Sequence, residues 1–171
     1  GRISEEKGIM TLIKSISTLK NINLKIVGDG PQLSEIKNIV KSKNLDHINF
    51  LGPIWGDELN NIISKAKFVI VPSKWYEPSP YSVIQALSFG KPVIGSNIGG
   101  ISDLIIHNNN GLLFESENSE DLKEKILSLY SDKNSIKKLG INAREFVRKN
   151  CDPEKYFNIT QKLFLKLISE K

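Results

Sequence analysis

The stretch that decides the fold runs from Phe68 to Gly100 and reads FVIVPSKWYEPSPYSVIQALSFGKPVIGSNIGG. It opens with four apolar residues at 68–71, as expected of a parallel strand that is covered on both faces. A polar loop, a helix and a second apolar strand follow, and a Gly-Lys-Pro sequence at 90–92 ends the helix. This β-loop-α-β unit places Glu77 and the start of the helix at the carboxyl end of a parallel sheet, where open α/β folds bind their ligands.

Strand and helix patterns alternate along the rest of the chain. Short apolar runs predict strands at 24–27, 48–51, 68–71, 93–95 and 112–114. Apolar residues three and four positions apart predict helices at 6–19, 33–40, 59–63, 101–106, 121–129, 136–147 and 156–168. The alternation predicts an α/β fold of Rossmann-like type, with one parallel sheet and helices on both faces.

The length and composition indicate one globular domain. A chain of 171 residues is large enough to bury its own core. No run approaches the roughly 18 consecutive apolar residues of a membrane span, and we expect no signal peptide before the fold. The single cysteine, Cys151, excludes an internal disulfide and fits a reducing compartment. Because the chain begins with Gly1-Arg2 rather than Met, we expect a fragment of a longer protein.

The net charge of +5 is unevenly distributed. Residues 133–171 hold ten Lys and Arg against four Asp and Glu, whereas residues 1–132 hold fourteen against fifteen. The basic surplus in the last helices fits either an anionic partner surface or a solvated lysine-rich face. No basic strand interleaved with aromatic residues and no zinc-ligand spacing is present, so we expect no nucleic acid. No Asp-x-Asp pair occurs, and His47 and His107 are too isolated for a metal site.

Two short segments invite a ligand interpretation. Gly28-Asp29-Gly30 follows a strand, but the third glycine of a dinucleotide fingerprint would fall at Leu33, so a plain turn explains the pair. Glu77 lies in a proline-containing loop, where it is either a solvated carboxylate or a ligand contact.

The helix after Glu77 predicts an anion site. The backbone N–H groups of Tyr81 and Ser82 open this helix and lack partners within it. Gln85 lies about one turn further on. Arg2 and Lys7, placed over the same sheet edge, would supply a guanidinium fork and a point charge for a diphosphate.

Seven short motifs follow one another in a recognisable order. They are Arg2-x4-Lys7-Gly8, Val27-Gly28-Asp29-Gly30-Pro31, Phe50-Leu51-Gly52, Pro72-Ser73, Glu77 with its partner position at 85, Gly90-Lys91-Pro92-Val93-Ile94, and Gly99-Gly100. With these motifs, the chain resembles the carboxy-terminal, donor-binding domain of group 1 (family 4) retaining glycosyltransferases of the GT-B fold, over essentially all 171 residues.

The resemblance implies a role for each candidate residue. Arg2 and Lys7 would hold the diphosphate of a nucleotide-sugar and stabilise the charge of the leaving group. Glu77 would be the first Glu of the family's E-x7-E motif and contact the donor sugar. The implied donor-binding residues are Tyr81 and Ser82 through backbone N–H groups, Gly28 through close approach of the nucleotide, Ile54 beside the base, and Gln85.

Two positions depart from the family pattern. Gln85 replaces the second Glu, which binds the ribose hydroxyls in the family. A charge-assisted hydrogen bond contributes roughly 1.5–3 kcal/mol against about 1 kcal/mol for a neutral one, so we expect an affinity cost on the order of 1 kcal/mol. Pro80 stands where many members have Gly, and we interpret it as a tolerated subgroup variant.

The resemblance also implies the reaction and its setting. The domain would bind a nucleoside-diphosphate sugar and, joined to an absent amino-terminal acceptor domain, transfer the hexosyl group to an acceptor hydroxyl with retention, without metal or cofactor. The isolated domain would be inactive, most of the strand before Arg2 would be missing, and the helix within 153–171 would cross back to the other domain. The expected setting is cytoplasmic polysaccharide biosynthesis, with a membrane surface or lipid-linked acceptor as a further partner of the full-length protein.

Two other functions remain open. A degenerate, non-catalytic module that binds a nucleotide or a partner would explain Gln85. A nucleotide-sugar epimerase shares the two-domain architecture but fits the order of the motifs poorly.

Overall fold

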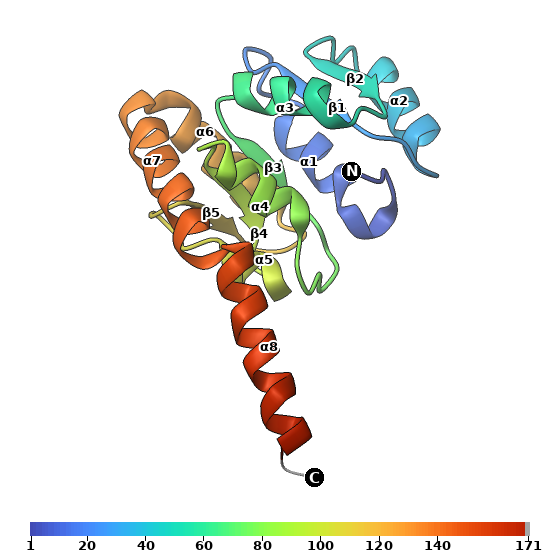
Figure 1. The fold of residues 1–171 in the computed structure, drawn as a ribbon. Helices are drawn as coiled ribbons and strands as arrows, with labels where there is room; N and C mark the ends of the chain where they lie inside the picture. The colour runs from blue at the N-terminus through green and yellow to red at the C-terminus, as the bar shows by residue number, and fades with distance from the viewer. Residues whose placement is uncertain (170–171) are drawn as a thin grey trace.

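Parallel strands form the centre of the protein (Figure 1). The computed structural model describes residues 1–169. Within them lie β1 (Leu24–Val27), β2 (Ile48–Gly52), β3 (Val69–Val71), β4 (Val93–Ser96) and β5 (Gly111–Phe114), and every paired neighbour runs parallel. The helical elements are η1 (Glu5–Lys7), α1 (Ile9–Ile16), α2 (Leu33–Ser42), α3 (Gly56–Lys65), α4 (Tyr81–Ser88), α5 (Gly99–Leu104), α6 (Ser119–Ser131), α7 (Lys133–Asn150) and α8 (Pro153–Ser169).

Helices cover both faces of the strands β3, β4 and β5. Ile94 packs in one hydrophobic cluster with Ile126 of α6, whereas its neighbour Val93 packs in another with Leu87 of α4. Successive strand residues point to opposite faces, so two clusters on one strand mean that both faces are buried. Helix α1 packs on α6 and helix α7 on α4, which completes the two outer layers. The Rossmann-like α/β prediction is confirmed.

The prediction of a single sheet is wrong in one respect. The strands form a two-stranded sheet, β1-β2, and a three-stranded sheet in the order β3-β4-β5. A cavity of about 690 Å³ lies between β1 and β3 and is lined by residues of both strands. Helix α3 turns Leu59, Ile62 and Ile63 toward this β1–β3 cavity, and it has no buried residue. The two strands are therefore too far apart to share backbone hydrogen bonds.

The predicted helix at 6–19 is broken at Gly8. This residue has φ +66° and separates the short η1 from α1. A Cβ atom at Gly8 would lie 1.8 Å from the carbonyl oxygen of Pro72, so only glycine fits. The carbonyl of Glu6 accepts hydrogen bonds from the Lys74 N–H (2.8 Å) and the Ser73 hydroxyl (3.0 Å). The break thus lets the chain before α1 pack against the end of β3.

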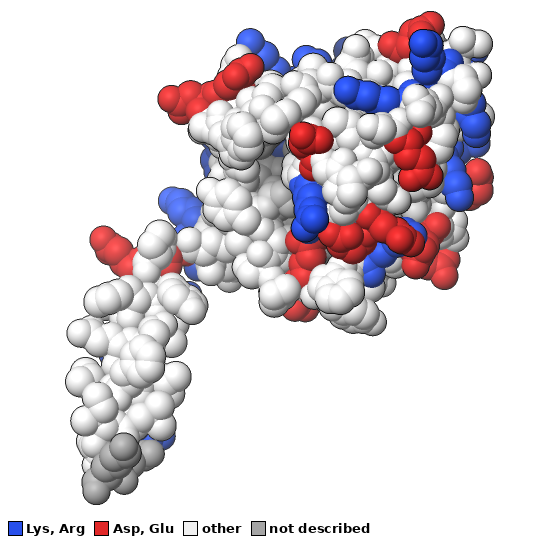
Figure 2. All heavy atoms as spheres, turned by 90° about the vertical axis from the view of Figure 1, so that its right-hand side faces the viewer, with Lys and Arg blue, Asp and Glu red and all other residues white. Residues whose placement is uncertain are grey.

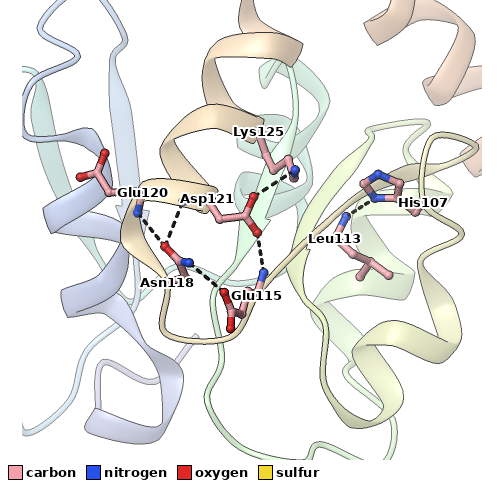
Figure 3. A network of polar contacts seen from close by, with 7 residues as sticks. All are labelled: His107, Leu113, Glu115, Asn118, Glu120, Asp121 and Lys125. Atoms are coloured by element: carbon pink, nitrogen blue, oxygen red, sulfur yellow. Dashed lines mark hydrogen bonds and ion pairs between the residues drawn. The ribbon is translucent and has the colours of Figure 1, made fainter.

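A polar network fixes the connection between β5 and α6 (Figure 3). Asn118 caps α6 by accepting from two backbone N–H groups of its first turn. The carboxylate of Asp121 accepts from the Glu115 N–H (2.7 Å) and pairs with Lys125 (3.0 Å). Burial alone would raise the pKa of Asp121, but the Glu115 N–H and Lys125 outweigh it and hold this pKa below its ordinary value. His107 Nδ1 accepts from the Leu113 backbone N–H of β5 (2.9 Å), and His107 forms an isolated bridge with Gly111 across the turn at 108–110.

Helix α8 projects from the rest of the molecule (Figure 2). The apolar side of this helix is exposed, since Phe157 and Phe164 keep 64% and 60% of their surface accessible and Leu163 and Leu167 keep 55% and 54%. On the face shown in Figure 2, acidic and basic residues are interspersed over the body of the domain. No helix within residues 1–169 is long and apolar enough to cross a bilayer. The predicted terminal helix at 153–171 extends past Ser169 into residues outside the described part of the chain.

Candidate functional site

The β1–β3 cavity brings together most of the residues that the sequence singled out. Its lining includes the last residue of β1, the two residues that follow β3 and the first two residues of α4. Seven of the eight candidates line it, namely Arg2, Lys7, Ile54, Glu77, Tyr81, Ser82 and Gln85. Gly28 is not among the lining residues. Residues more than 70 positions apart in the chain therefore share one cavity, as expected for the edge of a parallel sheet.

Lys7 and Glu77 form an ion pair in the cavity. The Lys7 Nζ and the Glu77 Oε1 are 2.8 Å apart. The Glu77 side chain keeps 17% of its surface accessible and that of Lys7 33%, so the pair is shielded on most sides but still reachable. Next to Lys7 in the chain, Gly8 lies so close to Pro72 that a Cβ atom there would clash, and this places Lys7 beside the loop after β3.

The loop that carries Glu77 is held from behind by the start of α5. The N–H of Gly100 donates to the Glu77 carbonyl oxygen at 2.8 Å. A Cβ atom at Gly100 would lie 2.5 Å from the Pro78 carbonyl oxygen and 2.6 Å from that of Glu77. The sequence marked Gly99-Gly100 only as a motif. Only the structure shows that Gly100 contacts the backbone of Glu77 and Pro78 and so positions the Glu77 loop.

The first turn of α4 presents unpaired N–H groups. Pro80 is the N-cap, and its carbonyl accepts from the N–H of Val83 at 2.9 Å. Within residues 1–169 no acceptor pairs with the N–H of Tyr81 or Ser82. These two groups and the positive end of the helix dipole make this end of the cavity favourable for an anion.

Gln85 lies one turn further along α4 and is fixed by a helix of the opposite wall. Its Nε2 donates to the Oδ1 of Asn60 on α3 at 3.1 Å, and both residues are half-buried. No feature of the sequence singled out Asn60, since its link to Gln85 spans 25 positions and two helices.

The glycine turn after β1 holds the start of the chain. The nitrogen of Gly1 donates to the Val27 carbonyl at 2.7 Å, and the N–H of Ile3 donates to that of Asp29 at 2.8 Å. Gly28 has φ +138°, and a Cβ atom there would lie 1.7 Å from the Gly1 carbonyl oxygen. The turn thereby positions Arg2 at the cavity. The contact of Gly28 with a nucleotide stays a prediction.

No ready-made metal centre is present in the described chain. Among residues 1–169, no three His, Cys, Asp or Glu side chains lie close enough together to hold a metal ion. The charged groups that line the cavity include Arg2 and the Lys7–Glu77 pair.

The model of the family described as "Glycosyl transferases group 1" matches residues 1–146. The chain belongs to this family. An uncharacterised glycosyltransferase of Methanocaldococcus jannaschii is 38% identical over 149 residues, which are 87% of this chain and 42% of that protein. The chain thus spans about two fifths of the length of this relative.

Solved structures place the chain in one half of the GT-B fold. Sucrose-phosphate synthase from Thermosynechococcus elongatus superposes with a TM-score of 0.90 and 30% identity, over 100% of this chain and 45% of that one. The isolated C-terminal domain of a group 1 glycosyl transferase from Francisella tularensis superposes with a TM-score of 0.81 and 25% identity, over 90% of this chain and 84% of that one. S. aureus TarM, solved with UDP, superposes with a TM-score of 0.87 and 26% identity, over 96% of this chain and 34% of that one. The resemblance to a carboxy-terminal GT-B donor-binding domain is confirmed.

Proposed function

We propose that this domain binds a nucleoside-diphosphate sugar in the β1–β3 cavity and donates its hexosyl group to an acceptor hydroxyl. The observation that supports this most directly is the Lys7–Glu77 pair, 2.8 Å apart, in the same cavity as the unpaired N–H groups of α4. The first turn of α4 suits a diphosphate, and the carboxylate of Glu77 suits the hydroxyl groups of a sugar. The UDP bound to S. aureus TarM supports UDP as the first nucleotide to test.

The roles of the residues follow from their charges and positions. The diphosphate takes over Lys7 from Glu77 and receives the Arg2 guanidinium and the N–H groups of Tyr81 and Ser82. Glu77, released from the ion pair, accepts hydrogen bonds from the donor sugar. The bond between the anomeric carbon and the diphosphate oxygen breaks, and the acceptor oxygen bonds to that carbon while its proton leaves with the diphosphate. Fixed cations close to the departing oxygen stabilise the developing negative charge.

Retention and independence from metal are part of the proposal. Arg2 and Lys7 are two fixed cations that can neutralise the charge of the diphosphate, which a divalent ion does in metal-dependent enzymes. Full-length enzyme is expected to keep its activity in a chelator and to give a product with the anomeric configuration of the donor. A loss of activity in chelator that Mg²⁺ restores, or an inverted product seen by NMR, would contradict this part.

A further strand and a second domain complete the proposed enzyme. A strand directly before Arg2 would fill the β1–β3 cavity. It would run parallel to β1 and β3 and join the two sheets into one. The apolar side chains of α3 that line the cavity support such an occupant. The acceptor, including any lipid-linked one, is assigned to the amino-terminal domain, which α8 would contact through its exposed apolar side. A longer chain that includes the preceding residues should unfold at a higher temperature.

Nucleotide binding to this domain tests the donor site. Titration calorimetry with UDP, GDP and ADP should detect one of them, and NMR shifts should map to residues 77–85. The double variant Arg2→Ala, Lys7→Ala should lose this binding, because both fixed cations are gone. Lys14→Ala, which removes an exposed lysine on α1, is the control and should bind as before. Failure of all three nucleotides to bind the folded chain at millimolar concentration would contradict the proposed donor site.

Gln85 supports a second candidate, a non-catalytic module that recognises a nucleotide without turnover. The two functions separate in the full-length protein. A transferase turns over donor and loses that activity in Glu77→Gln, whereas a module binds nucleotide and shows no transfer.

A further inference from the structure

The side chain of Gln85 links two walls of the β1–β3 cavity. Its Nε2 on α4 donates to the Oδ1 of Asn60 on α3 at 3.1 Å, and within residues 1–169 its side chain has no other hydrogen bond. Gln85 lines the cavity, whereas Asn60 is not among the lining residues. Asn60 therefore reaches a ligand in the cavity only through Gln85.

A side-chain amide has two N–H donors and one carbonyl acceptor. In Gln85 one N–H is occupied by Asn60, so the carbonyl oxygen and the second N–H remain available. A vicinal diol matches this pair, because one hydroxyl donates to the Gln85 carbonyl and the oxygen of the other accepts from the N–H. The last torsion of a glutamine side chain is broad and roughly two-fold, so an unanchored amide can turn over and exchange donor and acceptor.

We propose that Asn60 is a positioning residue that holds the Gln85 amide in the orientation that reads the 2′,3′-diol of the donor's ribose. This proposal rests on the function proposed above. It adds an explanation of how an amide at position 85 can bind the ribose in place of a carboxylate. Asn60 removes the freedom of the amide to turn over, so the acceptor atom is in place before the nucleotide arrives. Recognition of the diol then depends on a residue that never touches it.

The test compares each nucleoside diphosphate with its 2′-deoxy form. Calorimetry gives the affinity ratio of UDP to 2′-deoxy-UDP, with the GDP and ADP pairs measured in the same way. The unaltered chain should prefer the ribonucleotide, and Asn60→Ala should reduce this ratio by about two- to tenfold, as for one neutral hydrogen bond. Asn60→Asp keeps an acceptor for the Gln85 N–H and should restore the ratio. In a Gln85→Ala background, Asn60→Ala should have no further effect.

Asn61→Ala is the control, since Asn61 is the exposed neighbour on the same helix and should leave the ratio unchanged. Thermal unfolding of each variant separates a loss of fold from a loss of diol recognition. The role of Asn60 is overturned if Asn60→Ala leaves the ratio of ribonucleotide to deoxynucleotide affinity unchanged, or if it still changes this ratio in the Gln85→Ala background. Either result leaves the proposed donor site standing. Failure of every nucleotide to bind the folded, unaltered chain overturns the proposed function, and this inference with it.

Discussion

Replacement of Gly100 by alanine should move the Glu77 loop and destabilise the domain. The new Cβ atom would lie 2.5 Å from the Pro78 carbonyl oxygen and 2.6 Å from that of Glu77. The loop must retreat by about 0.8 to 0.9 Å to reach an ordinary van der Waals contact, an overpacking cost of about 1–3 kcal/mol. The 2.8 Å hydrogen bond from the Gly100 N–H, worth about 1 kcal/mol, weakens as well.

Alanine also brings a gain that offsets part of this cost, since it is favoured over glycine in a helix by roughly 0.5–1 kcal/mol. The net loss of about 2 kcal/mol predicts a melting temperature about 4 to 8 °C lower for a chain of this size. Circular dichroism measures that shift. Calorimetry with UDP and UDP-glucose then measures whether the displaced Glu77 weakens donor binding, and we expect the sugar nucleotide to lose more affinity than UDP.

Gly140→Ala is the control for Gly100→Ala. A Cβ atom at Gly140 would lie 2.4 Å from the Gly90 carbonyl oxygen, so it meets backbone in the same way but on α7, away from the cavity. It should destabilise the domain to a similar degree and leave donor affinity unchanged. Equal loss of affinity in both variants would show that stability, not the position of Glu77, governs binding. An unchanged melting temperature and affinity in Gly100→Ala would refute the contact argument.

Three further results are expected. Gln85→Glu should tighten nucleotide binding by about fivefold in a working transferase, because a charged acceptor adds on the order of 1 kcal/mol, and calorimetry would show no change in a degenerate module. The protein has two tryptophans, of which Trp55 lines the cavity and Trp75 does not; nucleotide should therefore change the fluorescence of Trp75→Phe and leave that of Trp55→Phe unaltered. Asp121→Asn should lower the unfolding free energy by about 1 kcal/mol near pH 7. Since the folded pKa of Asp121 is depressed, this contribution is present above its ordinary pKa and disappears as pH falls through the lower folded value, so denaturant titrations of the two proteins should converge in acid.

Local patterns were enough to locate almost every element. The apolar runs at 24–27 and 112–114 and the motif that opens α4 at Tyr81 predicted strand and helix positions to within a residue or two, because period and capping act over a few neighbours. The helix expected at 6–19 failed at Gly8, where the conformation is set by a contact with Pro72, 64 positions away in the chain. No local pattern contains that contact.

The sequence by itself determined the fold class, the family and the residue types of the proposed donor site, since each rests on short-range periodicity or on motifs in a fixed order. Only the tertiary structure decided which groups meet. It paired Lys7 with Glu77, placed Gly100 behind the loop, anchored Gln85 on Asn60 and separated β1 from β3 by a cavity. The physical reason is that hydrogen bonds and steric exclusion act over about 3 Å in space and are indifferent to separation along the chain.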